Sequence, residues 1–388
     1  MTNSPLGHSS SLRRLGVCTL AFGLVLTMAA CGSSKAASNA GTTNAATAAS
    51  AADLGGLDAL IAAAKKEGQL NVITLPRDWA NYGEIIDSFA AKYGIKVNSD
   101  NPDGSSQDEI NAVKSLKGQD RAPDVLDLGG AFAQSGAKEG LLAPYKVLTY
   151  NDLPADAKDA NANWYFDYGG YVSIGCDAKK IAVCPQTFAD LLKPDYKGKV
   201  ALNGDPTKSG SAFAGVFAAA LANGGAFTNI QPGIDYFSKL KKAGNYIPVE
   251  STPATIEKGE TPISIDWDYL NAGYVTELQG KGIDWRVVVP ADGQYANFYC
   301  QAISKSAPHP AAARLWEEYL YSDAGQNLFL KGHARPVRLP AMTTAGSANA
   351  TDAASLPKVS GAATYPTPDQ VDAAKKVLID NWSKALTG

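Results

Sequence analysis

The sequence predicts an α/β protein built from two lobes, and two observations lead to this prediction. Between residues 70 and 143, segments rich in branched aliphatic side chains alternate with segments whose apolar residues recur every three to four positions. This alternation of strands and helices is typical of a parallel sheet with helices on both faces. About 330 residues follow the small polar residues near the N-terminus, and a chain of that length usually divides its core between two lobes.

The elements of the first part have recognisable boundaries. The first helix spans residues 57–67 and ends before Gly68, because glycine is favoured just after a helix C-terminus. The elements predicted after it are a strand at 70–75, a helix at 82–93, a strand at 95–100, a helix at 107–119 and a strand at 124–129. Together they predict a lobe with a mostly parallel sheet flanked by helices.

The middle of the chain, up to Pro290, predicts a second α/β unit that opens with a strand rich in glycine and tyrosine. After Pro290 come a further strand, a helical pair and a long last helix that begins at a proline. The predicted strands lie at 165–176, 199–202, 261–267, 285–290 and 296–308. The predicted helices lie at 187–193, directly after 205–211, around 234–244, at 309–332 as a pair, and at 368–388.

The first 52 residues predict export. Two arginines precede a mostly apolar stretch at 15–30 that ends in small residues, which is the layout of a secretory signal peptide at 1–30. Cys31 follows directly, and this pattern resembles a bacterial lipobox, which implies that Cys31 is acylated and becomes the mature N-terminus. The alternative is an ordinary cleaved signal with an incidental cysteine. The residues after Cys31, up to residue 52, are small and polar and predict a flexible tether.

Charge and hydropathy limit the partners of the mature chain. Removal of residues 1–30 takes away two arginines and no acid, which changes the net charge from −3 to −5. This argues against nucleic acid as a partner, because binding to phosphates depends on concentrated positive charge. No later run is long and apolar enough to cross a bilayer, so attachment to the membrane is expected through the lipid anchor alone.

The other cysteines have separate expected roles. Cys176 and Cys184 are eight positions apart, and an exported chain permits a disulfide between them, with two unpaired thiols as the alternative. Cys300 is left over and is expected to be a small buried residue.

Several motifs in order carry a family resemblance. Between Leu57 and Leu339 the chain contains AAKKEGQLNVIT, PDVLDLGG, GLLAPY, TFADLLKPDYKGKVAL, DPTKSGSAF, APHPAAARLWEEYLYSDAGQ and ARPVR. This ordered set resembles the extracellular solute-binding proteins of ABC importers, in the branch that contains ferric-iron, polyamine, thiamine and aminoethylphosphonate binders. Each motif alone is weak.

The resemblance implies a type II periplasmic-binding-protein-like fold, with two α/β lobes joined by hinge strands and a solute closed in the cleft. Lobe 1 is then expected to contain residues 53–168 and 300–388, part of the latter packing on lobe 2, and lobe 2 residues 169–299. The crossings are expected near 168–174 and 297–303. The implied partners are a small solute and the membrane subunits of an ABC permease, with the protein monomeric and lipid-anchored on the extracytoplasmic face of the membrane.

The sequence shows little sign of catalysis. His309 lies between two prolines, His333 follows a helix, and the remaining histidine is in the signal peptide. There is no G-x-S-x-G elbow, C-x-x-C pair, H-E-x-x-H helix or Walker loop. We therefore expect a protein that is not an enzyme and that uses no cofactor and no metal site of its own.

Ligand-binding residues are expected on loops that follow strands, because in open α/β sheets ligands gather at the carboxyl ends of the strands. The first loop carries a carboxylate and aromatic rings, the second a carboxylate and glycines, and the third serines at a helix start whose amides can hold an anion. The alternatives are packing within one lobe for Trp79 and helix capping for Asp127 and the serines. The residues chosen from these loops are Asp78, Trp79, Tyr82, Asp127, Gly129, Ser209 and Ser211.

The fourth loop has two carboxylates on either side of a tryptophan, directly after a strand. Two such acids are costly to bury without a counter-charge, which makes them the most specific ligand signal in the chain. Tyrosines on the two crossing strands are expected to complete the wall, with a place in the core as the alternative. These considerations add Asp266, Trp267, Asp268, Tyr269, Tyr168 and Tyr299 to the predicted site.

The predicted site favours an organic cation, because aromatic faces and ionised carboxylates both attract an ammonium group. Trp79, Trp267, Tyr269, Asp78 and Asp268 supply these groups. The set is similar to the aromatic and acidic box of polyamine binders. A polyamine or a related organic amine is therefore the leading expectation for the solute.

Other solutes stay open. Ferric-iron binders carry adjacent tyrosines, which this chain lacks, although Tyr269 and Tyr274 keep iron as an alternative. A phosphonate would be held by residues 209–211 with Lys208 or Arg77, and a zwitterion would use both kinds of group. The remaining alternative class is a cell-surface hydrolase.

Overall fold

The computed structural model of the chain describes residues 44–359 and 365–387. The predicted signal peptide, Cys31 and the first part of the predicted tether lie outside the described residues. Among the described helices, none combines the length and the hydropathy needed to cross a membrane.

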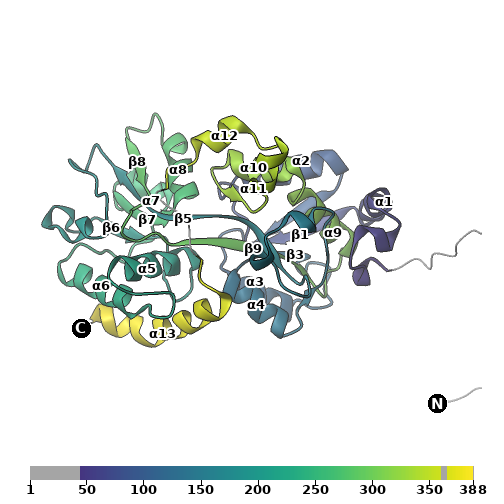
Figure 1. The fold of residues 1–388 in the computed structure, drawn as a ribbon, viewed down its shortest axis with the longest axis horizontal. Coiled ribbons are helices and arrows are strands. Elements are labelled where there is room, and N and C mark those ends of the chain that lie inside the picture. The colour runs from purple at the N-terminus through teal and green to yellow at the C-terminus, as the bar shows by residue number, and fades with distance from the viewer. Residues whose placement is uncertain (1–43, 360–364, 388) are drawn as a thin grey trace, which may run out of the picture. The chain divides into compact units, whose positions relative to one another are not determined.

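The first group of elements confirms the predicted alternation of helices and strands (Figure 1). Helix α1 and helix α2 are each followed by a glycine in the left-handed conformation, Gly68 and Gly94, as the sequence indicates. The elements of this group are α1 (Leu57–Glu67), β1 (Gln69–Ile73), α2 (Tyr82–Tyr93), β2 (Lys96–Asp100), α3 (Ser106–Ser115), β3 (Val125–Gly129), α4 (Gly130–Lys138) and β4 (Leu142–Ala143).

The second and third groups complete the fold. The second consists of β5 (Tyr165–Asp177), β6 (Val200–Leu202), α5 (Gly210–Ala222), α6 (Gln231–Lys242), α7 (Pro253–Lys258), β7 (Ile263–Trp267), α8 (Asp268–Glu277) and β8 (Trp285–Val288). The third consists of β9 (Ala296–Ser304), α9 (Pro310–Leu320), α10 (Asp323–Lys331), β10 (Arg335–Pro336), α11 (Leu339–Ala345), α12 (Ala350–Ser355) and α13 (Pro368–Thr387).

Two long strands connect the halves of the fold. The main sheet has the strand order β3-β9-β5-β7-β6, with β4 on β9 and with β8 and β10 on β5. Figure 1 shows β5 and β9 between a first lobe, containing β1–β4 and α1–α4, and a second lobe, containing β6–β8 and α5–α8. The division of the chain into 53–168 plus 300–388 and 169–299 stays a prediction.

The direction of the strands differs from the expected mostly parallel sheets. The pairs β1–β2 and β6–β7 are parallel, but β3, β5 and β9 pair antiparallel with their neighbours. The reason is that β9, which comes from a much later part of the chain, lies beside β3, and that β5 lies between β9 and β7. The α/β class is confirmed, and the sheet is mixed.

Glycines in β5 allow other segments to approach this strand closely. A Cβ atom on Gly170 would overlap the carboxylate of Asp268 and the ring of Tyr269, and one on Gly169 would overlap the backbone of Asn297. Because glycine has no side chain, β5 can pack directly against the start of α8 and against β9. The glycine-rich strand in the sequence thus corresponds to the most crowded strand of the sheet.

At the end of β5 the structure contains a disulfide. Cys176 and Cys184 are joined, and their Cα atoms lie 5.9 Å apart. Cys300 is free and buried in β9.

The predicted flexible tether is wrong for residues 44–52, which pack on the first lobe. Ala48 and Ala51 are buried. The guanidinium of Arg314 is also buried, and it donates to the carbonyls of Ala48 (2.8 Å) and Ala46 (3.2 Å). A buried guanidinium needs acceptors, and the small side chains of this segment let its backbone supply them.

Replacement of Arg314 by leucine is expected to release residues 44–52 and to lower the free energy of unfolding by about 3 kcal/mol, the scale for hydrogen bonds to a charged group. Limited proteolysis followed by mass spectrometry would detect new cleavage in this segment, and urea unfolding would give the stability. Arg121→Leu is the control, since Arg121 is exposed and contacts Gln119. A protected segment in Arg314→Leu would contradict this account.

The C-terminal helix α13 lies against helices of both lobes. It packs on α6 and on α4, and Figure 1 shows it running from the second lobe toward α4. Trp382 contacts Phe237 on α6 with ring centroids 5.5 Å apart, and Gln134 on α4 donates to Asp369 at 3.1 Å. The last helix therefore connects the two lobes in addition to β5 and β9.

Candidate ligand-binding site

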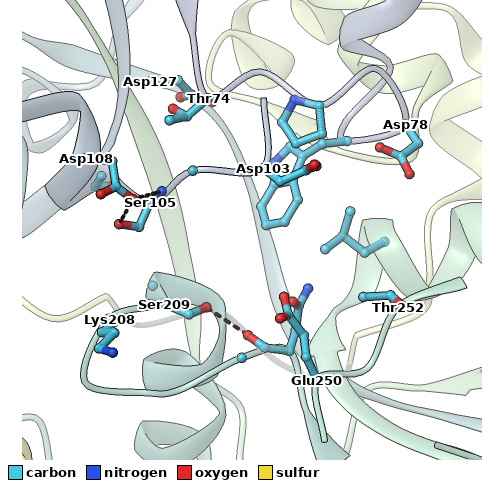
Figure 2. A pocket seen from close by; sticks show the side chains of 18 of the residues that line it. Thr74, Asp78, Asp103, Ser105, Asp108, Asp127, Lys208, Ser209, Glu250 and Thr252 are labelled. Atoms are coloured by element: carbon cyan, nitrogen blue, oxygen red, sulfur yellow. Dashed lines mark hydrogen bonds between the residues drawn. The ribbon is translucent and has the colours of Figure 1, made fainter. Parts of the chain in front are cut away.

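A cavity of about 640 Å³ lies between the two lobes. The first lobe contributes residues after β1, residues at the start of α3 and residues of β3, and the second lobe contributes the loop after β6 and the start of α7. Figure 2 shows this arrangement, with Asp127 and Thr74 on one side of the space and Ser209 and Glu250 across from them. The ends of strands and the starts of helices thus meet at the cavity, as expected for an α/β sheet.

The side chains around the cavity carry mostly negative charge. Seven carboxylates line it, and Lys208 is the one basic side chain among the described lining residues. A cleft lined by charges of one sign concentrates ions of the opposite sign. The cavity therefore favours a cation. The seven carboxylates belong to Asp78, Asp103, Asp108, Glu109, Asp127, Asp205 and Glu250.

Asp127 and Thr74 carry buried polar atoms that point to a ligand. Asp127 is 6% exposed, and neither its Oδ1 nor Thr74 Oγ1 has a hydrogen-bond partner among the residues in the structure. Thr74 also has a φ of +52°, a left-handed conformation that a β-branched residue rarely adopts and that tends to occur at functional sites. Because buried polar atoms are normally paired, both are available to a bound molecule.

The buried carboxyls of Asp127 and Glu109 have altered acidity. Burial raises the pKa of Asp127 to about 7, although the hydrogen bond from Tyr168 lowers it. Burial, and after it the charge of Asp127, raise the pKa of Glu109. The two groups are adjacent, since the Asp127 backbone N–H donates to Glu109 Oε2 at 2.8 Å. A cation in the cavity would favour the ionised form of both.

Five of the predicted aromatic residues form one cluster beside Asp127. Trp79 and Tyr299 line the cavity, and their ring centroids are 5.8 Å apart. Trp79 Nε1 donates to the Tyr168 hydroxyl at 2.7 Å, and that hydroxyl donates to Asp127 Oδ2 at 2.9 Å. Tyr269 and Trp267 complete the cluster. These two hydrogen bonds form a relay from Trp79 through Tyr168 to Asp127 Oδ2. Asp127 Oδ1 is therefore the oxygen available to a ligand.

One side of the cavity has a different character. Ser209 caps α5, accepting from the backbone of Ala212 at 3.2 Å, and Ser105 stands at the start of α3. In Figure 2, Ser105, Ser209 and Lys208 lie on one side, together with the carboxylate of Asp108, and Asp78 lies on the other. Helix starts and a lysine favour an anionic group, while Asp108 opposes it.

Asp266, Asp268 and Ser211 do not line the cavity, although the two acids were the most specific ligand signal in the sequence. Asp266 accepts from Ser211 Oγ, from Asn203 Nδ2 at 2.8 Å and from the backbone of Trp267 at 2.8 Å. Asp268 forms a buried ion pair with Arg335 and accepts from the backbone of Tyr171 at 2.9 Å. The counter-charge and donors that these acids need come from the protein itself.

Five other predicted residues also lie outside the cavity lining, and one of them is the buried Trp267. Tyr82, Tyr168 and Tyr269 are buried in the core. The Tyr82 hydroxyl accepts a hydrogen bond from Gln301 Nε2 at 2.9 Å, and the Tyr168 hydroxyl donates to Asp127. The backbone N–H of Gly129 donates to Ser106 Oγ at 3.0 Å. The structure therefore places Asp78, Trp79, Asp127, Ser209 and Tyr299 of the predicted set at the cavity.

Several residues that line the cavity were not predicted from the sequence. Thr74 directly follows β1, and residues 103–106 lie between β2 and the first turn of α3, in a position equivalent to the predicted loops. Glu109 lies on the inward face of α3, beside buried Ile110. Glu250 and Thr252 lie near the start of α7. The expectation that ligands gather at strand ends could have predicted residues 103–106. The positions of Glu109 and Glu250 at the cavity depend on how the helices pack, which the sequence does not indicate.

No group of three or more His, Cys, Asp or Glu side chains is placed to hold a metal ion within the described ranges. Of the two tyrosines that kept iron open, Tyr274 lines the cavity and Tyr269 does not. Arg77 pairs with Asp87 at 2.5 Å and does not line the cavity, so Lys208 is left as the basic residue for an anion.

Solved structures share this fold at low sequence identity. The AfuA binding protein from Actinobacillus pleuropneumoniae, with fructose-6-phosphate bound, is 20% identical with a TM-score of 0.63, covering 83% of this chain and 99% of its own. Iron-bound HitA from Pseudomonas aeruginosa is 21% identical with a TM-score of 0.58, covering 82% and 99%. A protein from Listeria monocytogenes assigned to spermidine and putrescine transport is 14% identical with a TM-score of 0.59, covering 81% and 98%. Comparison with curated protein sequences found no match.

The fold and the cavity define a two-lobed, type II periplasmic-binding-protein-like receptor for a small solute. Residues 120–373 match the family model of bacterial extracellular solute-binding proteins. The chain belongs to this family, which confirms the family of extracellular solute-binding proteins predicted from the sequence.

Proposed function

We propose that this protein captures a small organic amine between its lobes and delivers it to the permease of an ABC importer. The observation that carries the proposal is the excess of seven carboxylates over one lysine around the cavity. The ammonium group would bind at Asp127 Oδ1 and Thr74 Oγ1, the buried atoms that lack partners in the described structure. The faces of Trp79 and Tyr299 would contribute cation–π attraction.

The proposal places the mature protein on the extracytoplasmic side of the membrane, held by an acyl chain on Cys31, as a monomer without catalytic activity. A polyamine is the first candidate solute, which agrees with the resemblance seen in the sequence and with the fold shared with the Listeria monocytogenes protein. Closure of the lobes around the ammonium group would remove water from the carboxylates and strengthen their attraction.

A second candidate is an anionic or zwitterionic solute. Lys208 and the starts of α3 and α5 favour it, on the side of the cavity opposite Asp78. The fold shared with AfuA, whose structure holds fructose-6-phosphate, makes sugar phosphates worth testing. Iron is the third candidate, since HitA has been seen with iron bound.

The direct test is a thermal-shift panel of amines, aminoethylphosphonate, fructose-6-phosphate and ferric citrate. A solute that binds the folded state alone raises the free energy of unfolding by about 2.7 kcal/mol at a hundredfold excess over Kd. Stabilisation by amines supports the proposal, and stabilisation by the anions or iron alone overturns it.

The affinity for an amine is expected to rise with pH through about 7. The pKa of Asp127 is raised to about 7 in the free protein, so its carboxyl is mostly neutral below that pH, while an alkylammonium stays charged until about pH 10. The raised pKa of Glu109 acts in the same direction. Calorimetry at pH 6 and pH 8 should show tighter binding at pH 8, with proton release. Equal affinities would remove Asp127 from the site.

A further inference from the structure

A smaller chamber of about 40 Å³ adjoins the acidic cavity. The two spaces share the wall residues Lys208, Ser209, Gly210 and Tyr299. A Cβ atom on Gly210 would come within 3.4 Å of the Tyr299 hydroxyl. Gly210 and Tyr299 therefore lie close together in the wall that the two spaces share.

The chamber differs in chemistry from the cavity. No carboxylate is found among its described lining residues. Its walls are aromatic and aliphatic, and Trp267, which the sequence predicted as a ligand contact, lines this chamber and not the acidic cavity. The apolar side chains are those of Ala131, Phe132, Phe213, Trp267, Phe298, Tyr299 and Val371.

The charged groups of the chamber are both basic. Lys208 and Lys375 line it, and Lys375 Nζ lies 3.2 Å from the ring centroid of Phe132. Burial lowers the pKa of Lys375 to about 8. A second ammonium group in this space would lose its hydration and lie near the amino groups of Lys208 and Lys375, which is unfavourable. An apolar group would instead pack against aromatic rings, which is favourable.

We propose that the cavity and the chamber form one composite site, and that its solute is an amine with a short apolar end in place of a second ammonium group. This inference rests on the proposed function and narrows its organic amine to one with a single ammonium group, so it disfavours the polyamine that was the first candidate there. The ammonium binds at Asp127 in the acidic cavity, and the apolar end passes Gly210 and Tyr299 into the chamber under α13. The chamber has room for about three water molecules, which suits a short alkyl end.

Helix α13 thereby acts as a specificity element. Val371 of α13 is 7% exposed and closes the chamber, while Ile379 on the same helix is 52% exposed. The helix also connects α6 with α4. A larger side chain on α13 that fills the chamber should exclude the apolar end of the solute, without contact to the carboxylates of the acidic cavity.

The test uses three probes with the same six-carbon chain and different ends: hexylamine, 1,6-diaminohexane and 6-aminohexanoate, with butylamine and octylamine to vary the reach. Calorimetry should give a wild-type affinity for hexylamine about tenfold higher than that for the diamine. Hexylamine buries its last one to two carbons in the chamber, whereas the diamine keeps its second ammonium group, and the carbons beside it, in water. Val371→Phe should remove this preference, and Ile379→Phe should leave it unchanged. Gly210→Val, which adds a side chain to the wall shared by the cavity and the chamber, is a second variant that should act like Val371→Phe.

Three outcomes would overturn the composite site: a diamine that binds as tightly as hexylamine, a carboxylate-ended probe that binds tighter than both, or a Val371→Phe variant that weakens all probes alike. In each of these cases amines still bind and Asp127→Asn still weakens them, so the proposed function stands. If no amine binds the wild-type protein, both proposals fail. Thermal unfolding of each variant verifies that it is folded.

Discussion

Replacement of Asp127 by asparagine is expected to weaken amine binding by about 10- to 100-fold, since a hydrogen bond to a charged group contributes about 1.5–3 kcal/mol. Asparagine keeps an oxygen that can accept from the Tyr168 hydroxyl, so the relay from Trp79 survives. What is lost is the negative charge at the base of the cavity. Calorimetry would measure the affinity, and the pH dependence between 6 and 8 should be reduced with it.

The fold of Asp127→Asn is not expected to suffer. The pKa of Asp127 is raised to about 7 by burial, so its ionisation opposes folding as the pH rises from about 4 to about 7. Removal of that charge should leave the melting temperature at pH 8 equal or higher. Asp205→Asn is the matched control, because Asp205 also lines the cavity but is exposed and accepts from Thr207 within its own loop. Equal loss of affinity in both variants would refute the special role of Asp127.

Replacement of Arg335 by methionine is expected to lower the free energy of unfolding by about 3–5 kcal/mol, because loss of one partner of a buried ion pair leaves an uncompensated charge. The side chain of Asp268 is fully buried and that of Arg335 is 16% exposed. The guanidinium also donates to the Pro357 carbonyl at 2.7 Å and lies 4.9 Å from the ring centroid of Tyr171. Urea unfolding at pH 8 would measure the change.

The matched control for Arg335→Met is Arg286→Met. Arg286 pairs with Asp284 at 2.7 Å, but both side chains are exposed, and such pairs contribute less than about 1 kcal/mol. Burial raises the pKa of Asp268, and Arg335 lowers it, so loss of Arg335 should be less harmful at pH 5, where the carboxyl takes up a proton. Similar costs for the two variants, or a cost independent of pH, would refute the role of the buried pair.

Local signals in the sequence were sufficient for α1 and α2 of the first lobe, whereas α4 was not predicted and α3 ends four residues before its predicted end at 119. The ends of α1 and α2 follow from Gly68 and Gly94, because a residue with positive φ after a helix depends on local geometry alone. The direction of β3 and the packing of residues 44–52 were not accessible in this way. They depend on β9 and on Arg314, more than 170 residues further along the chain.

The two acids around Trp267 illustrate the limit for the site. Their sequence indicates that Asp266 and Asp268 need compensation, and this is correct, since both are buried and fully engaged. It does not indicate that Arg335 and Ser211 supply the compensation in place of a ligand. Asp127, in contrast, lies at the cavity because β3 ends there. Its Oδ1 has no partner in the described structure.

The sequence by itself determined the α/β class, the family and the bounds of α1 and α2. These properties depend on local periodicity and on ordered motifs, which are independent of distant contacts. Only the tertiary structure decided which carboxyl groups line the cavity and that an apolar chamber adjoins it. A buried charge is compensated by whichever group the fold brings beside it, and that group lies far away in the chain.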